Sequence, residues 1–194
     1  MRRRALLSLP IRIIPFIKSD GTKYIDTGFK PNGDTRVIME CDFLELSPLP
    51  SEGGEGNSCF FGSRTEAQLD SYHFFFQTTN MVFLWDYGSS GNRTTIEDSS
   101  PLRKLYIDYN KNVLIFNDEV YETEYKEFQT EYNLTLLASN QKDVTHWGAS
   151  VALYFCKIYD NGTLIRDFIP CINNNQNGLY DKLNNKFYPL LDRE

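Results

Sequence analysis

The sequence predicts an all-β protein, a two-sheet antiparallel β-sandwich of the jelly-roll kind, on three observations. Two runs rich in aromatic and β-branched residues flank Asn161-Gly162, which is the pattern of a β-hairpin with a type I′ turn. Strand-like runs recur about every 8–12 residues, and no long segment keeps a helical periodicity. Aromatic residues make up 14% of the chain, including 12 Tyr and 14 Phe, so we expect rings to pack against rings between two sheets.

The Asn-Gly hairpin also predicts a register. With those two residues as the loop, we expect three facing pairs: Tyr159 with Leu164, Ile158 with Ile165, and Phe155 with Phe168. Both sides of this strand pair carry apolar residues, so it belongs inside a sandwich. The same register opposes Lys157 and Arg166, a like-charge pair that weakens a strand pair. We expect an anion such as Asp167, solvent at the rim, or an acidic partner to compensate it.

The elements before this hairpin follow in order. Asp20-Gly21 separates two short strands at 14–18 and 23–27. Residues 36–46 alternate, so that Val37, Met39, Cys41 and Phe43 share one side, which predicts a half-buried strand. Residues 48–58 are rich in Pro, Gly, Ser and Glu and have nothing to bury, so we expect an exposed loop there.

Further strands are expected at 59–62, 72–78, 81–87, 93–96, 102–109, 113–117, 119–125 and 132–138. Residues 139–148 are expected to form a polar loop that contains Trp147. A second compact hairpin is predicted around Asn184-Asn185, with strands at 178–183 and 186–188.

Length, charge and cysteine usage narrow the class of protein. A chain of 194 residues suits one buried core, and we divide it into an arm at 1–15 and a sandwich domain at 16–194. The net charge of −6 argues against a nucleic-acid partner, because such proteins present clustered Lys and Arg. The four cysteines lack the close spacing of zinc ligands and are expected to be free core thiols, with one disulfide as the alternative.

Residues 1–15 begin with three arginines and then turn apolar, as a signal peptide does. Pro10, Arg12 and Pro15 interrupt the apolar stretch, no small-residue cleavage site follows it, and it is too short to span a bilayer. We therefore expect an extended arm and no membrane partner. Two interpretations stay open: a peptide that docks on a partner subunit, or a strand or frayed end on its own domain. Docking would use these residues of the arm: Arg2, Arg3, Arg4, Leu6, Leu7 and Ile11.

Several sequence blocks together resemble a concanavalin A-like, laminin-G-like jelly-roll domain: IKSDGTKYIDTGFKPNGDTRV, CFFGSRT, KIYDNGTLIRDFIPC and GLYDKLNNKFY. The version that they resemble occurs in tailed-phage structural proteins and gut-bacterial surface proteins. Some short phage proteins of this kind also begin with a Met-Arg-Arg-Arg start like that of Met1 to Arg4. The resemblance spans residues 16–188 and implies a two-sheet sandwich that binds or displays, often with carbohydrate as ligand. It supplies no catalytic residue.

Carbohydrate binding requires a flat ring beside amide and carboxylate hydrogen-bonding groups. In the segment MVFLWDYGSSGNR, Trp85 and Tyr87 share one side of a strand near Asn92, and this is the first candidate site. Trp147 in the polar loop is the second. The alternative for Trp85 and Tyr87 is a place in an aromatic core stripe, which we favour for Trp85.

Glu40-Cys41-Asp42-Phe43-Leu44-Glu45 fits the E-x-D-x-x-E pattern of laminarinase-type glycosidases, which are retaining enzymes with a concanavalin A-like fold. Retaining chemistry needs two carboxyl groups about 5–5.5 Å apart. In a regular strand Glu40 and Asp42 project to one side and Glu45 to the other, and only a β-bulge near Phe43-Leu44 would realign them. No tryptophan lies near this strand in the sequence. We therefore expect a solvated polar face and no enzymatic activity.

No cofactor or metal is expected. Calcium takes six or more oxygen ligands, and no loop here has a D-x-D-x-D arrangement, although Asp143 or Asp160-Asn161 would suit part of a site. His73 and His146 lack partners at the spacing of a catalytic triad.

The expected function is a non-enzymatic accessory or adhesion protein on a phage virion surface. Its arm would dock on capsid or tail proteins, and its loops would face host or mucosal glycans. A bacterial surface or secreted lectin-like module is the first alternative, and a laminarinase-type glycoside hydrolase is the second.

Overall fold

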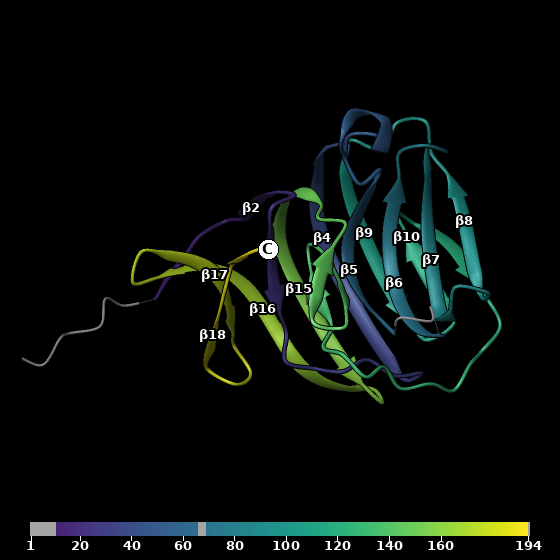
Figure 1. Ribbon diagram of the computed structural model, residues 1–194. Helices are drawn as coiled ribbons and strands as arrows, with labels where there is room; N and C mark the ends of the chain where they lie inside the picture. Colours follow the sequence, from purple (N-terminus) through teal and green to yellow (C-terminus); the bar gives the residue numbers. More distant parts are fainter. Residues whose placement is uncertain (1–10, 66–68, 194) are drawn as a thin grey trace, which may run out of the picture.

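Two β-sheets pack face to face within residues 11–65 and 69–193, the part of the chain that the computed structural model describes (Figure 1). The first sheet has ten strands, in the order β11 (Glu119–Glu122), β10 (Val113–Phe116), β9 (Lys104–Asn110), β4 (Thr35–Glu45), β15 (Ser150–Asp160), β16 (Thr163–Asn173), β17 (Gln176–Asp181) and β18 (Lys186–Pro189), with β1 (Arg12–Ile13) beside β16 and β2 (Ile17–Asp20) beside β15.

The second sheet has nine strands in the described residues, in the order β19 (Leu191–Asp192), β3 (Lys23–Asp26), β12 (Thr135–Leu136), β5 (Asn57–Arg64), β6 (Leu69–Gln77), β7 (Val82–Ser89) and β8 (Arg93–Glu97), with β13 (Ser139–Gln141) and β14 (Val144–His146) attached at β5. The described helical structure is one short 3₁₀ turn, η1 (Pro50–Glu52). All strand pairs are antiparallel except β13 with β5. The predicted fold class, an all-β antiparallel two-sheet sandwich, is confirmed.

The core lies between the sheets and is built from alternating strand residues. In β4, Val37, Met39, Cys41 and Phe43 are buried as the sequence pattern predicts. Phe43 meets Phe60 of the second sheet edge to face, with ring centroids 5.1 Å apart. Each such ring removes a large apolar area from water, so the alternation in β4 sets which side of the first sheet faces the core.

Buried tyrosines tie the two layers together. The rings of Tyr72 (β6) and Tyr109 (β9) stack with centroids 4.2 Å apart. The Tyr109 hydroxyl donates to the Asp86 carbonyl at 2.9 Å, and the Tyr87 hydroxyl donates to the Gly33 carbonyl at 2.6 Å. Burial raises the pKa of Tyr72 and Tyr109 well above the usual range, so both stay neutral. The hydroxyl groups are thereby satisfied inside an aromatic core.

The Asn-Gly hairpin has the predicted turn but a different register. Asn161 (φ 45°) and Gly162 (φ 75°) both adopt positive φ, as a type I′ turn requires. Tyr159 faces Leu164 as expected, but a β-bulge follows, so that Cys156 faces Phe168. The predicted pairs of Ile158 with Ile165 and of Phe155 with Phe168 are therefore wrong, because the chain accommodates one extra residue at Ile165.

The same bulge removes the predicted like-charge pair. Ile158 faces Arg166, and Lys157 faces Asp167, so cation and anion now lie opposite each other. The carboxylate of Asp167 also forms an ion pair with Lys182 at 2.7 Å.

The segment 132–148 differs most from the prediction. The expected strand at 132–138 contracts to Thr135–Leu136, because Leu137 adopts a positive φ of 69° and interrupts the extended chain. The expected polar loop folds into the β13–β14 hairpin, whose turn places Lys142 and Asp143 at φ 56° and 61°. None of these three positions is a Gly, so the sequence carried no signal of their positive φ angles.

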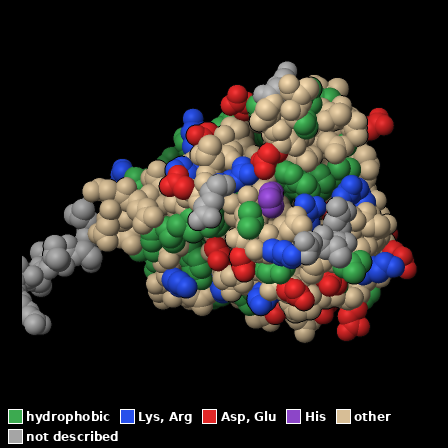
Figure 2. All heavy atoms as spheres, in the orientation of Figure 1, with side chains coloured by type: hydrophobic (Ala, Val, Ile, Leu, Met, Phe, Trp, Pro, Cys, Tyr) green, Lys and Arg blue, Asp and Glu red, His purple; other side chains and the backbone are tan. Residues whose placement is uncertain are grey.

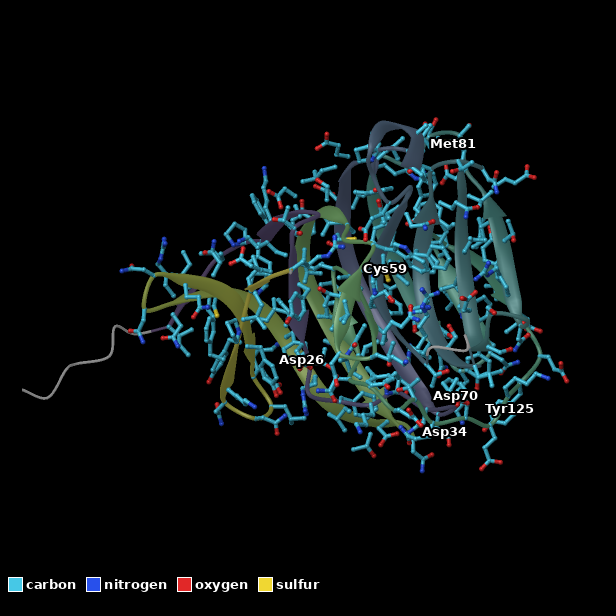
Figure 3. The ribbon with its side chains drawn as sticks, in the orientation of Figure 1. Asp26, Asp34, Cys59, Asp70, Met81 and Tyr125 are labelled. Carbon is cyan, nitrogen blue, oxygen red and sulfur yellow. The ribbon has the colours of Figure 1, made fainter. Side chains whose placement is uncertain are left out.

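The two ends of the sandwich can be followed in Figure 3, and the C-terminus is marked in Figure 1. Figure 3 shows Met81 at one end of the sandwich and Asp34, Asp70 and Tyr125 at the other. Figure 1 shows β17 and β18 extending away from the body. Ile11 is 38% exposed, and β1 pairs with Cys171 and Ile172 of β16. The other arm residues named above, from Arg2 to Leu7, lie outside the described residues.

Cys41, Cys59, Cys156 and Cys171 are buried and free. Burial raises the thiol pKa of each, that of Cys171 to about 11, so none is a reactive thiolate. In the described part of the chain, no helix is long and apolar enough to cross a membrane.

Candidate functional site

The outer face of the first sheet, over β4, β9 and β15, combines carboxylates with aromatic rings. One row of paired residues crosses the three strands: Phe155 pairs with Glu40, and Glu40 pairs with Tyr106. Tyr106 is 37% exposed, and Phe155 is half-buried. We call this surface the β4–β9–β15 face, and it contains these side chains: Glu40, Asp42, Glu45, Tyr106, Tyr154 and Phe155.

A β-bulge at Leu44 brings all three acidic residues of β4 to this face. Phe43 pairs with Val151, but Glu45 pairs with Ser150, so Leu44 is the extra residue. Val151 is wholly buried in the core, and Ser150 therefore lies on the outer side. Glu45 shares that side with Glu40 and Asp42. A bulge at this place was the condition for the three carboxylates to share a face. The sequence pattern predicted a regular strand instead.

A second bulge, at Tyr154, places two consecutive rings outside. Leu153 pairs with Cys41 and Phe155 with Glu40, so Tyr154 is the extra residue. Leu153 and Cys156 both point into the core and are wholly buried. Tyr154 and Phe155, which lie between them, both project from the outer face. A regular strand would have turned one of the two rings inward.

Two of the three carboxylates of the face, those of Glu40 and Asp42, have a partner of opposite charge or a hydrogen-bond donor. Glu40 forms an ion pair with Lys104 at 2.7 Å. Asp42 accepts a hydrogen bond from the Tyr154 hydroxyl at 2.6 Å, and this contact raises the pKa of Tyr154. The Lys104 ammonium also lies 5.1 Å from the centre of the Tyr154 ring. Rings, anions and cations therefore alternate on one surface.

A cavity of about 370 Å³ lies at the end of this face. Asp20, Ser150 and Glu45 pair across β2, β15 and β4, and all three line the cavity. Hydrogen bonds from Thr22 lower the pKa of Asp20, so this carboxylate is charged at neutral pH. Within the described residues, Glu45 has no hydrogen-bond or ion-pair partner, so its carboxylate is available to a bound molecule.

The opposite wall of the cavity is held by Arg193 near the end of the chain. Its guanidinium donates to both oxygens of Glu55 at 3.0 and 2.8 Å and to the Gly21 carbonyl at 2.6 Å. These contacts join the loop after β4, the β2–β3 turn and the C-terminal strand. The shape of the cavity therefore depends on three separate segments.

Two of the rings predicted to bind carbohydrate are in the core. Trp85 and Tyr87 have no solvent exposure, and Trp85 meets Tyr109 edge to face at 5.2 Å. A sugar needs an open ring face for stacking, so the structure corrects the prediction for these two residues and supports the core alternative.

Asn92 and Trp147, the other two residues predicted to bind carbohydrate, lie in different surroundings. Asn92 is buried and donates to the carbonyls of Tyr87 (2.9 Å) and Glu124 (2.7 Å), which is a structural role. Trp147 is half-buried, and the Arg64 guanidinium lies over its ring at 4.1 Å. The structure therefore does not bring Trp85, Tyr87, Asn92 and Trp147 together as one site.

Sequence reasoning missed the rings of the β4–β9–β15 face. Tyr106 lies between buried Leu105 and Ile107, and this alternation was a usable signal for an outward side chain. Tyr154 and Phe155 had no such signal, because their orientation depends on a bulge. Among the described residues, no group of three or more His, Cys, Asp or Glu side chains is placed to hold a metal ion.

Comparison with known proteins finds similarity among solved structures only. No protein family model and no curated protein matches the sequence. The chain is similar to a fructofuranosidase from Schwanniomyces occidentalis complexed with fructose, with 17% identity and a TM-score of 0.40 over 78% of this chain and 35% of that chain. The match thus spans about a third of the enzyme, and at this level it does not bear on activity or ligand.

Proposed function

We propose that the protein is a non-enzymatic glycan-binding module and that the β4–β9–β15 face is its binding surface. The observation that carries this proposal is the row Phe155, Glu40 and Tyr106, in which two rings flank a carboxylate. The rings lie two strand spacings apart, about 10 Å, a length comparable to a disaccharide. Ring faces stack on the apolar side of a sugar, and charged groups bind its hydroxyls.

The charge pairs on this face favour binding over cleavage. Glu40 is held by Lys104 and Asp42 by the Tyr154 hydroxyl. Carboxylates held in this way are oriented acceptors for hydroxyl groups. A nucleophile in a retaining glycosidase needs instead a partner carboxyl group placed to act as acid and base.

The test is glycan-array screening followed by calorimetry on the glycans that bind. We expect Tyr106→Ala and Phe155→Ala each to weaken binding about tenfold, which is about 1.4 kcal/mol. Leu183→Ala is the matched control, because Leu183 is an exposed apolar residue beyond β17, outside the face. Unchanged affinity in both ring variants would refute this binding surface.

A glycoside hydrolase is the second candidate, and the Leu44 bulge favours it. The bulge places Glu40, Asp42 and Glu45 on one face beside a cavity. This function predicts release of reducing sugar from β-glucan and its loss in Glu40→Gln and Glu45→Gln. The binding proposal predicts no release by the wild-type protein, so one reducing-sugar assay separates the two.

The setting that we propose is the surface of a phage particle, with the N-terminal arm attached to capsid or tail proteins. The sequence resemblance to phage structural proteins and the basic, apolar arm support it. Deletion of residues 1–10, which leaves the β1–β16 pairing in place, is expected to abolish copurification with virions. Glycan binding should persist in that variant, since the deletion removes none of the side chains that make up the β4–β9–β15 face.

A further inference from the structure

A second surface lies on the outer side of the second sheet, where side chains from β5, from β13 and from the residue after β14 meet. Arg64 is the last residue of β5, Gln141 is the last residue of β13, and Trp147 follows β14. The Arg64 guanidinium lies 4.1 Å from the centre of the Trp147 ring, and its Nε donates to Gln141 Oε1 at 3.0 Å. Figure 2 shows basic side chains and an apolar patch close to the histidine in view.

Arg64 has no close carboxylate partner among the residues that the structure describes. The described residues form no ion pair with it, whereas Arg36, Arg93 and Arg103 each have an aspartate partner at 2.5–2.6 Å. Burial lowers the pKa of Arg64, the negative charge of Asp86 opposes this shift in part, and the positive charge of Arg93 adds to it. A half-buried guanidinium without an anion is costly, and a bound anion would relieve that cost.

The surroundings of Arg64 are flat and apolar. Trp147 packs on Phe75 with centroids 5.2 Å apart, and Phe75 belongs to a small outer cluster with Cys59, which Figure 3 labels among the strands of this sheet. The nearby Arg93 lies 5.5 Å from the Phe75 ring, and its own charge is taken up by both oxygens of Asp86. In the described part of the chain, Arg64 is therefore a cation of this surface without an ion-pair partner.

We propose that Arg64, stacked on Trp147 and anchored by Gln141, binds the anionic group of an acidic sugar, either a carboxylate or a sulfate. The guanidinium offers its two terminal nitrogens, which match two oxygens of either group. A ligand with one negative charge suits this site, because the net charge of −6 repels a polyanion. The Gln141 amide beside the guanidinium suits the hydroxyl groups of a sugar carrying that charge. This site lies on the other sheet from the β4–β9–β15 face and does not depend on it.

The test uses three probes in calorimetry: sialyllactose with one carboxylate, sulfated lactose with one sulfate, and neutral lactose. We expect at least one charged probe to bind and lactose to bind at least about tenfold more weakly. Arg64→Gln should abolish the preference for the charged probe, and Arg64→Lys should retain part of it, because the charge remains but the paired geometry is lost. Arg12→Gln is the matched control, since Arg12 is an exposed arginine with no ion pair in the described residues.

Binding of sialyllactose alone identifies a carboxylate site, and binding of sulfated lactose alone identifies a sulfate site. Equal affinity for charged and neutral probes, or an unchanged preference in folded Arg64→Gln and Arg64→Lys, would overturn the proposal. So would binding of a glutamate-bearing peptide when neither charged sugar binds. Tyr106→Ala changes the β4–β9–β15 face and leaves the Arg64 site intact. Loss of binding at the one surface can therefore be told apart from loss of binding at the other.

Discussion

At the scale of the residue, exposure separates rings that build the fold from rings that can meet a ligand. Trp85 and Tyr106 are both aromatic strand residues, yet Trp85 has no exposure and Tyr106 is 37% exposed. Their positions in the alternation of β7 and β9 account for the difference. Composition alone could not make this distinction.

Replacement of Trp85 by Ala should therefore act on stability. We expect Trp85→Ala to lower the free energy of unfolding by about 3–5 kcal/mol, because the cavity removes contacts with core rings. Urea denaturation followed by circular dichroism measures this loss. Trp147→Ala, at a half-buried position, should cost less, and a Trp85→Ala protein as stable as wild type would contradict the core assignment.

His73 is the buried titratable residue of the second sheet. Its Nδ1 lies 3.1 Å from Ser71 Oγ and its Nε2 2.8 Å from Ser139 Oγ. Burial lowers the pKa of His73, and Asp86, 3.9 Å away, opposes this shift only in part. The imidazole is therefore neutral at pH 7 and bridges two hydroxyl groups. Although Ser, His and Asp meet here, all three are buried, so the arrangement is structural.

The lowered pKa of His73 predicts how stability depends on pH. The unfolded chain binds a proton at His73 near its ordinary pKa of about 6.5, before the folded protein does. The stabilisation that the neutral imidazole contributes is therefore complete above about pH 6.5. It decreases as the pH falls from there toward the lowered pKa of His73 in the folded protein. Urea unfolding should show this decline, and His73→Gln should flatten it. The same slope in both proteins would contradict the assignment.

At the scale of the element, the sequence predicted strands well and bulges not at all. The alternation in β4, the Asn-Gly turn and most strands are present where the pattern placed them. The bulges at Leu44, Tyr154 and Ile165 each shift one residue. A bulge is selected by tertiary pairing and leaves little local signal, so the composition of the β4–β9–β15 face could not be derived from strand parity.

The type I′ turn gives a prediction at this scale. Gly162 has φ 75°, in the left-handed region that a side chain disfavours. Gly162→Ala should destabilise the protein by about 1 kcal/mol, and thermal unfolding measures it. Thr163→Ala, at the exposed neighbouring position, should change stability little. Equal midpoints for Gly162→Ala and wild type would mean that the turn has another geometry.

At the scale of the whole molecule, the sandwich uses its two outer surfaces differently. The inner faces are filled with rings and fix the spacing of the sheets. The first sheet presents the β4–β9–β15 face, and the second presents Arg64 on Trp147. Since the two-layer scaffold holds both surfaces, we expect binding at either proposed site to leave the core unchanged.

The most direct measurement of the central claim is amide chemical-shift mapping during titration with a glycan selected on the array. The proposed function predicts that the largest shifts cluster at Glu40, Asp42, Tyr106, Tyr154 and Phe155, and that the glycan remains uncleaved at the end of the titration. Shifts confined to other strands, or conversion of the glycan to shorter sugars, would contradict it.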